Sequence, residues 1–114
     1  MAEITETYPE SITGDRGTVL WETVTCGDTG RAVELKDFND NTVQVSGTFN
    51  SQTLTMQGSN DNSTWFTLKL FTGVVAEFTE AGGGVIAEAP RYIRPSFSGS
   101  TGGDLDVYLQ LRKA

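Results

Sequence analysis

Apolar and polar residues alternate along much of the chain, and turn-forming residues separate the alternating runs. The clearest pair of runs spans residues 53–68, where Leu54 and Met56 alternate with threonine and glutamine before a polar turn at 58–62. Period-2 alternation is typical of a half-buried strand, and a run of Gly, Ser, Asn and Asp favours a tight turn. The stretch therefore predicts a β-hairpin of fixed register, because a one-residue slip would turn its apolar face to water.

Similar runs recur at intervals of roughly ten residues, and no stretch shows a convincing helical period. They lie at residues 18–25, 31–36, 42–49, 91–98 and 104–112. Pro95 interrupts one of them, and because proline cannot donate to a ladder, that strand lies at a sheet edge or carries a bulge. Seven or eight strands of this spacing predict an all-β fold, an antiparallel and jelly-roll-like sandwich.

The inward faces of these strands predict one shared hydrophobic core. Its expected members are Val43, Val45, Phe49, Leu54, Met56, Phe66, Leu68, Leu70, Ile93, Phe97, Leu105, Val107, Leu109 and Leu111. Val33 and Leu35 are also expected to point inward.

Two blocks of apolar residues have no evident place in that core. The first block is Ile4, Tyr8 and Ile12, and the second is Val74, Val75, Phe78, Val85 and Ile86. The first block has a helical spacing of four, but Pro9 and Gly14 interrupt it. We therefore expect an extended N-terminal arm over residues 1–16 and a single sandwich domain over residues 17–114. A monomer would expose these side chains as an apolar patch, which soluble proteins keep small unless it binds something.

Charge and composition exclude several partners. The chain has 114 residues, a net charge of −7 and no histidine. An acidic surface repels nucleic acid and anionic membranes, so we expect neither as a partner. No apolar run reaches the ~20 residues of a membrane span. Residues 1–6 lack the basic and apolar regions of a secretory signal, so we expect synthesis in a cytosol.

Catalytic chemistry has little support in the sequence. Without histidine, the commonest general base is missing, and Cys26 has no basic cluster that would lower the pKa of its thiol. The acidic residues are explained better by a solvated surface than by a glycosidase pair, and Asp37 and Asp40 better by a turn than by a calcium loop. Gly82-Gly83-Gly84 lacks the Lys-Ser/Thr of a phosphate loop. We expect no enzyme activity, no cofactor and no metal.

Residues 57–65, followed by residues 89–94 (Ala-Pro-Arg-Tyr-Ile-Arg), resemble the strand motifs of discoidin-like carbohydrate-binding modules of the coagulation factor 5/8 C-terminal type. The resemblance covers about half the chain and concerns scaffold residues. It implies a jelly-roll sandwich and, as one alternative, a glycan-binding module, possible on a virion surface. That function requires an exposed aromatic platform, for which the candidates are Trp21, Trp65 and Tyr108.

The whole chain also resembles the small β-sandwich proteins that tailed bacteriophages encode beside their major capsid protein. The shared runs are residues 43–49, 54–61, Trp65, residues 91–95, residues 98–99 and the final alternating strand. The resemblance implies a capsid decoration, or cement, protein: a structural virion protein on the capsid exterior, synthesised in the cytoplasm of a bacterial host. The implied partners are the major capsid protein and further copies of the chain in a homotrimer. The resemblance carries no catalytic residues.

Within this interpretation, the two unplaced apolar blocks become candidate interfaces. We assign Ile4, Tyr8 and Ile12 to the capsid. We assign Val74, Val75, Phe78, Val85 and Ile86 to contacts between copies.

Overall fold

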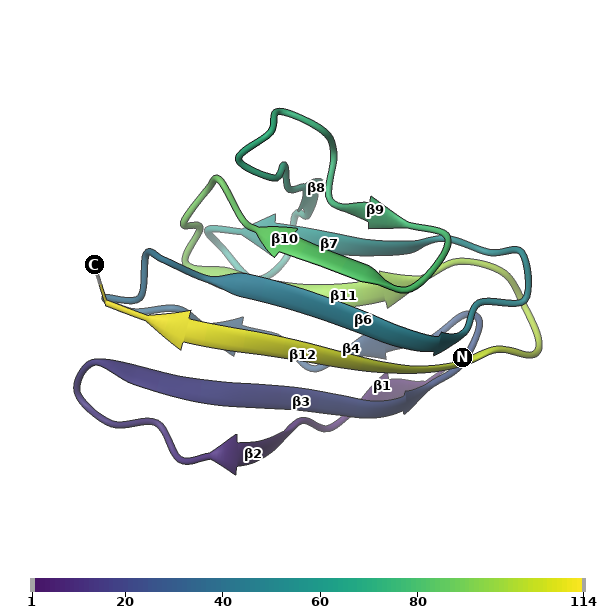
Figure 1. The fold of residues 1–114 in the computed structure, drawn as a ribbon, viewed down its shortest axis with the longest axis horizontal. Coiled ribbons are helices and arrows are strands. Elements are labelled where there is room, and N and C mark those ends of the chain that lie inside the picture. The colour runs from purple at the N-terminus through teal and green to yellow at the C-terminus, as the bar shows by residue number, and fades with distance from the viewer. Residues whose placement is uncertain (1, 114) are drawn as a thin grey trace.

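Residues 2–113 are described by the computed structural model, which packs two sheets face to face and has no helix in that range (Figure 1). The first sheet contains β1 (Glu3–Ile4), β4 (Thr29–Gly30), β5 (Val33–Glu34), β7 (Leu54–Ser59), β8 (Phe66–Thr67), β9 (Glu77–Phe78) and β11 (Tyr92–Phe97). The second sheet contains β2 (Thr7–Glu10), β3 (Arg16–Val24), β6 (Thr42–Thr48), β10 (Gly82–Val85) and β12 (Asp104–Arg112). The strand pairs are antiparallel except for β1 with β4, which is parallel.

The strand order is that of a jelly roll. The second sheet runs β10-β6-β12-β3-β2, and the first runs β1-β4-β11-β7-β8, with β5 also on β11 and β9 also on β7. From β3 onward the chain crosses repeatedly between the sheets, and its long strands β3 and β12 end up side by side. If β4 with β5 and β8 with β9 each count as one broken strand, the order is that of an eight-stranded double Greek key. The predicted all-β, jelly-roll-like sandwich is therefore confirmed, with β1 and β2 as additions to it.

Alternation along the long strands builds the core between the sheets. In β12 every second residue from Leu105 to Leu111 is fully buried, whereas Asp104, Tyr108 and Arg112 are exposed. Twelve of the expected core members are buried: Val43, Val45, Phe49, Leu54, Met56, Leu68, Ile93, Phe97, Leu105, Val107, Leu109 and Leu111. Val33 and Leu35 are buried as well. The pleat of a strand sends successive side chains to opposite faces, so this alternation was readable from the sequence.

Two expected core residues behave differently. Leu70 is only partly buried against the core, and Phe66 is 44% exposed. In the ladder Phe66 lies opposite Gly58, and a Cβ built on Gly58 would lie 2.6 Å from Pro90 and 2.7 Å from Leu68. Because these two side chains already fill the space over Gly58, the larger ring of Phe66 is left outside. The core assignment of Phe66 is therefore wrong.

Pro95 lies in a central strand and not at an edge. β11 pairs with β7 on one side and with β4 and β5 on the other. The register shifts by one residue between the pairs Ser96↔Thr29 and Ile93↔Val33, and Pro95 lies between them. The extra residue lies in the facing segment, where residues 30–32 oppose only Arg94 and Pro95, so the irregularity is opposite Pro95 and not in β11 itself. An irregularity of this kind leaves Pro95 without a ladder donor to supply.

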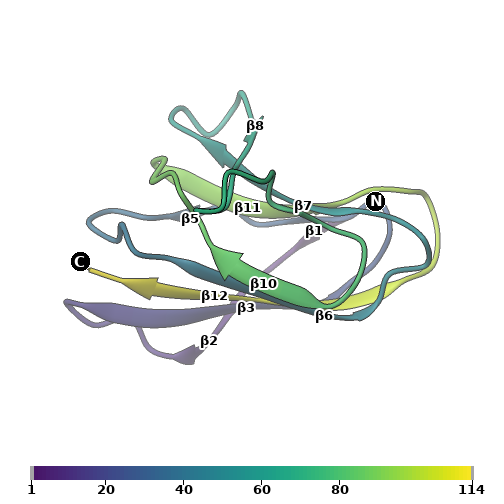
Figure 2. The same ribbon diagram turned by 45° about the horizontal axis from the view of Figure 1, so that its top comes forward.

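The segment expected as a free N-terminal arm is part of the sandwich. Its first strand, β1, pairs with β4 in the first sheet, and the chain then crosses to pair β2 with β3 in the second (Figure 2). The Ala2 N–H donates to the buried carboxylate of Asp28 at 2.9 Å, and Ile4 packs against the core. Residues 2–10 therefore close one lateral edge of the sandwich, because backbone pairing and apolar burial offset the entropy of ordering them.

The opposite edge is closed by residues 66–87. This segment leaves the first sheet through β8 and β9 and joins the second sheet through β10. Within it, the Phe71 N–H donates to the Val85 carbonyl and the Ala87 N–H donates to the Lys69 carbonyl. Between β8 and β9 the chain projects away from both sheets as a hairpin (Figure 1). The second apolar block thus lies in the closing segment 66–87, and Ile4 and Tyr8 of the first block lie in the closing segment 2–10, with Ile12 just beyond it.

The burial pattern predicts which truncations destabilise the fold. Leu68 and Leu109 are fully buried, so Leu68→Ala and Leu109→Ala should each lower the free energy of unfolding by about 2–5 kcal/mol. Denaturant unfolding followed by fluorescence measures this loss. Gln44→Ala, on the exposed face of β6, is the control and should change it by no more than about 0.5 kcal/mol. Losses below about 1 kcal/mol at both leucines would contradict the assignment of the inward faces.

Candidate functional site

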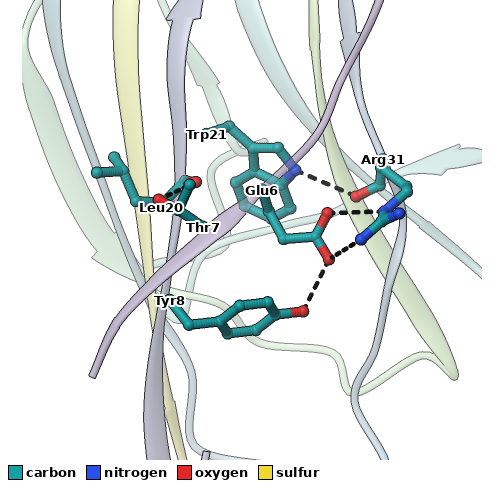
Figure 3. Close-up of polar contacts among 6 residues, drawn as sticks. All are labelled: Glu6, Thr7, Tyr8, Leu20, Trp21 and Arg31. Atoms are coloured by element: carbon teal, nitrogen blue, oxygen red, sulfur yellow. Dashed lines mark hydrogen bonds and ion pairs between the residues drawn. The ribbon is translucent and has the colours of Figure 1, made fainter. Parts of the chain in front are cut away.

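A buried carboxylate fixes the N-terminal closing segment. Glu6 lies between β1 and β2 and is almost fully buried. The Arg31 side chain donates to both of its oxygens, from Nε at 2.9 Å and from Nη2 at 3.2 Å, and the Tyr8 hydroxyl donates at 2.7 Å (Figure 3). The backbone carbonyl of Arg31 accepts a hydrogen bond from Trp21 Nε1 at 3.1 Å. The carboxylate thus ties residues 6–8 to the strand region around Arg31 and to the core tryptophan.

The protonation states fit a stabilising role. Burial alone would raise the pKa of Glu6, but hydrogen bonds from Arg31 and Tyr8 together outweigh it and hold that pKa below its usual value. Partial burial and the neighbouring carboxylate raise the pKa of Tyr8 to about 12. Glu6 therefore remains ionised and Tyr8 remains neutral near neutral pH. Both groups are already engaged by protein partners, so the cluster positions the segment and offers no free acid, base or nucleophile.

A groove opens beside this cluster on the same lateral edge. It has a volume of about 260 Å³ and separates the N-terminal segment from the chain around β5. Its lining residues are Glu6, Tyr8, Ile12, Ala32, Val33, Glu34, Lys36 and Phe38. Tyr8 and Ile12 are each 42% exposed. Of the three residues assigned to the capsid, the structure brings these two together at the groove, whereas Ile4 is turned toward the core. The open groove is smaller than the ~300–1,000 Å³ pockets that hold small molecules.

Basic side chains gather next to the groove, at the end where β3 begins and β12 ends. Arg16, Arg112 and Lys113 line an open hollow of about 520 Å³ together with Asp15 and Gln110. Arg112 lies directly opposite Arg16 in the β12–β3 ladder. Like charges in that position repel each other, and within residues 2–113 no carboxylate lies within ion-pair distance of the Arg112 guanidinium. Arg16 is paired with Glu10 and Lys113 with Asp37, so Arg112 is the basic residue of this hollow that can receive an acidic group.

The hairpin at the opposite edge carries a second apolar surface. Phe71, Val74 and Val75, which we call the hairpin patch, are 69%, 60% and 40% exposed. Val75 pairs with Lys69, and the Gly73 N–H donates to the Leu70 carbonyl, which forms the turn at the tip. Gly73 has a φ of +89°, a conformation that favours glycine. The patch is held at the end of a projecting turn, where its side chains cannot reach the core.

The five residues assigned to contacts between copies have different positions. Val74 and Val75 belong to the hairpin patch. Phe78 and Val85 are half-buried, and Ile86 is 1% exposed in the core. Ile86 therefore cannot contact another copy, because its side chain fills space between the sheets. Sequence reasoning missed Phe71, although its place directly before Thr72-Gly73 is the signal of a turn that would leave it exposed.

The three candidate residues of a glycan platform are not brought together. Trp21 is fully buried, so its ring offers no face to a ligand. Trp65 is half-buried, and the Arg94 guanidinium lies 4.0 Å from its ring centroid. Tyr108 is 36% exposed and borders a shallow hollow on the outer face of the second sheet. An aromatic platform for sugars needs open ring faces in one plane, and only Tyr108 keeps one.

Other chemical features of the chain have structural explanations. Cys26 is buried in the core. In the polar turn after β7, Asp61 accepts hydrogen bonds from the N–H groups of Thr64 and Ser63, which with Ser59 lower its pKa to about 2. In the part of the chain that the structure describes, no three His, Cys, Asp or Glu side chains are grouped to hold a metal ion. Residues 2–113 also contain no helix with the length and apolarity needed to cross a membrane.

Comparison with known proteins supports the fold. No protein-family model and no curated protein matches the sequence. Among solved structures, the SPBc2 prophage-derived protein YomS is similar, with a TM-score of 0.61 and 13% identity over 90% of this chain and 98% of that one. A cupin domain from Bordetella pertussis Tohama I has a TM-score of 0.49 and 11% identity over 97% of this chain and 95% of that one. The chain shares its jelly-roll class of β-sandwich with the phage-derived protein.

The buried carboxylate makes stability depend on pH. Replacing Glu6 with glutamine keeps the shape but removes the charge, which should lower the free energy of unfolding by about 1–3 kcal/mol at neutral pH. Because the pKa of Glu6 is depressed from 4.5 in the folded state, its stabilisation is present above the unfolded-state pKa and is lost as pH falls through the folded-state pKa. Urea unfolding of the parent and of Glu6→Gln should therefore converge in acid.

Tyr8→Phe is the matched control, because it removes one hydrogen bond to the same carboxylate and leaves the ion pair. It should cost about 0.5–1.5 kcal/mol. If Glu6→Gln were as stable as the parent protein at neutral pH, the ion pair would not be what holds the closing segment.

Proposed function

We propose that this chain is a structural protein of a bacteriophage particle, which binds the outer surface of the capsid and cements neighbouring capsomers without catalysis. The observation that carries the proposal is that exposed apolar side chains lie on both closing segments of one jelly roll. The two segments are at opposite edges of the sandwich (Figure 1). One surface is the groove with Tyr8 and Ile12, and the other is the hairpin patch. A domain with two such surfaces can hold two partners at once.

The hairpin patch exposes large apolar side chains to solvent. Phe71 is 69% exposed and Val74 60% exposed, a concentration of apolar surface that monomeric proteins keep small unless it binds something. Repeated over a closed shell, many weak contacts act together, because each bound copy raises the effective concentration of the next contact. The net charge of −7 suits a position on the outside of a shell, away from the packaged genome.

Two similarities add support. The prophage-derived protein with a similar fold comes from a phage genome by its name. The longer sequence runs that resemble phage decoration proteins fall mostly in β6, β7, β11 and β12, whereas Trp65 and residues 98–99 lie in connections. We place the protein on the capsid exterior after synthesis in the host cytoplasm. Its partners in this proposal are the major capsid protein and further copies of itself in a homotrimer.

We assign each of the two surfaces to one of these partners. The groove edge, with Tyr8 and Ile12 exposed, faces the capsid, and Ile4 fixes the start of the same segment by packing against the core. The hairpin patch contacts a neighbouring copy. Phe78 and Ile86 hold the hairpin segment against the core, so their contribution to that contact is indirect. Val85 is half-buried in β10 and can add to the contact from beside the hairpin.

Capsid binding is tested by co-sedimentation with undecorated capsids of the encoding phage. The parent protein should pellet with the capsids, and the double variant Tyr8→Ser/Ile12→Ser should bind at least tenfold more weakly. The matched control is Tyr108→Ser, which removes an equally exposed aromatic ring from another face. Failure of the parent protein to bind capsids at saturating concentration would refute the proposed function. Equal binding by the double variant would remove this edge from the capsid contact.

Self-association is tested by analytical ultracentrifugation of the purified protein. At tens of micromolar we expect an oligomer, and Phe71→Ser/Val74→Ser should shift it to the monomer because these side chains are the most exposed of the hairpin patch. Thr72→Ala, at the same tip, is the control and should leave the oligomer intact. A parent protein that is strictly monomeric at this concentration would contradict the assignment of the patch to neighbouring copies.

A further inference from the structure

One side of β5 is an open strand edge. β5 pairs with β11, and no other described strand pairs with it. The Leu35 N–H donates to the Arg91 carbonyl, so Leu35 and Arg91 form a hydrogen-bonded pair. In an antiparallel ladder, such pairs alternate with pairs whose backbone N–H and C=O groups point away from the partner strand. The next pair, Glu34↔Tyr92, is therefore of the second kind, and the N–H and C=O of Glu34 point away from β11.

The same edge already receives an extended segment a few residues earlier. There β1 pairs in parallel with β4, and the Arg31 N–H donates to the Ile4 carbonyl at 2.8 Å. Beyond Ile4 the chain turns away to the second sheet and leaves the continuation of the edge at β5 uncovered. The groove described above lies along this uncovered stretch, since Ala32, Val33 and Glu34 form one of its walls.

We propose that an extended segment of the major capsid protein lies in this groove and adds to β5 as a further strand. The inference rests on the proposed function and names the mode of contact. In strand addition, main-chain hydrogen bonds supply affinity and the pockets for alternate side chains supply specificity. Here Glu34 offers the backbone donor and acceptor, and Tyr8, Ile12 and Phe38 offer apolar contacts to inward-facing side chains of the incoming strand.

Charge indicates the chemistry of that strand. The groove is lined by Lys36 and by Glu6 and Glu34, and these two carboxylates are already paired with Arg31 and Arg91. In the neighbouring hollow, Arg16 pairs with Glu10 and Lys113 with Asp37. The guanidinium of Arg112 has no ion-pair partner among residues 2–113. An incoming segment with apolar side chains in the groove and a carboxylate beyond it matches this arrangement, and complementary charges of this kind fix register and orientation.

A second copy of the chain is a poorer occupant. Throughout residues 2–113, the strands are already engaged in the two sheets, and the longer connections are tied to them by backbone hydrogen bonds. No described segment is therefore free to extend into a neighbour's groove without unfolding part of its own sandwich. We therefore assign the strand to the capsid protein, and pairing with a second copy is a separate outcome of the test.

The test compares two substitutions of one residue. Glu34→Pro removes the outward N–H, and Glu34→Ala removes the same side chain, with its 3.0 Å contact to Arg91, but keeps the N–H. In co-sedimentation with undecorated capsids, we expect Glu34→Ala to bind within twofold of the parent protein and Glu34→Pro to bind at least tenfold more weakly. Circular dichroism and thermal unfolding establish that each variant is folded.

If Glu34→Pro does not fold, a second variant tests whether a strand occupies the groove. Ala32→Phe places a ring in the groove from its wall and should also weaken capsid binding at least tenfold. Capsid binding by the parent protein together with unchanged binding by the folded variants would overturn strand addition while leaving the proposed function in place. Absence of binding by the parent would instead overturn the proposed function. Loss of self-association in either folded variant would make a second copy the occupant and also overturn the proposal.

Discussion

Closure of the sandwich at its lateral edges is the constraint on which the other features depend. Two packed sheets expose backbone groups and apolar side chains along both sides, and exposed edges invite unwanted pairing. This chain closes one side with residues 2–10 and the other with residues 66–87. The Glu6–Arg31 pair holds the first closure in place, and Ile86 anchors the second in the core. Some apolar side chains of these segments remain exposed, and they form the groove wall and the hairpin patch.

The long strands were predictable because their physics is local. A pleated strand between core and solvent imposes period 2, and in β6, β7 and β12 that period is visible in the sequence. The two closing segments gave no such signal. Their strands β1, β8 and β9 have two residues each, too few for a period. Glu6 and Arg31 are separated by 25 positions, and only the folded chain brings them together.

The segments that carry the candidate surfaces could be predicted from the sequence, but the individual residues that are exposed on them could not. Excess apolar residues in two blocks correctly marked the segments that carry exposed apolar side chains, since a core of fixed volume cannot accept them all. Which residues remain outside depends on details that sequence does not carry. Phe66 is excluded because Pro90 and Leu68 occupy the space over Gly58, whereas Ile86, from the same block as Val74, enters the core. Trp21 is likewise excluded from an exposed aromatic platform, because β3 directs its side chain into the core.

The central place of β12 in the second sheet has a consequence for how the chain can fold during synthesis. β12 lies between β3 and β6, and it is the last strand to leave the ribosome. Until residues 104–112 are available, the inner edges of β3 and β6 have no partner and the apolar faces of the first sheet have only part of their cover. Pairing of strands so distant in sequence makes folding slow, since a large loop must close before its contacts form. The sandwich therefore remains open until β12 has been synthesised, and commitment to the native state falls after that strand emerges.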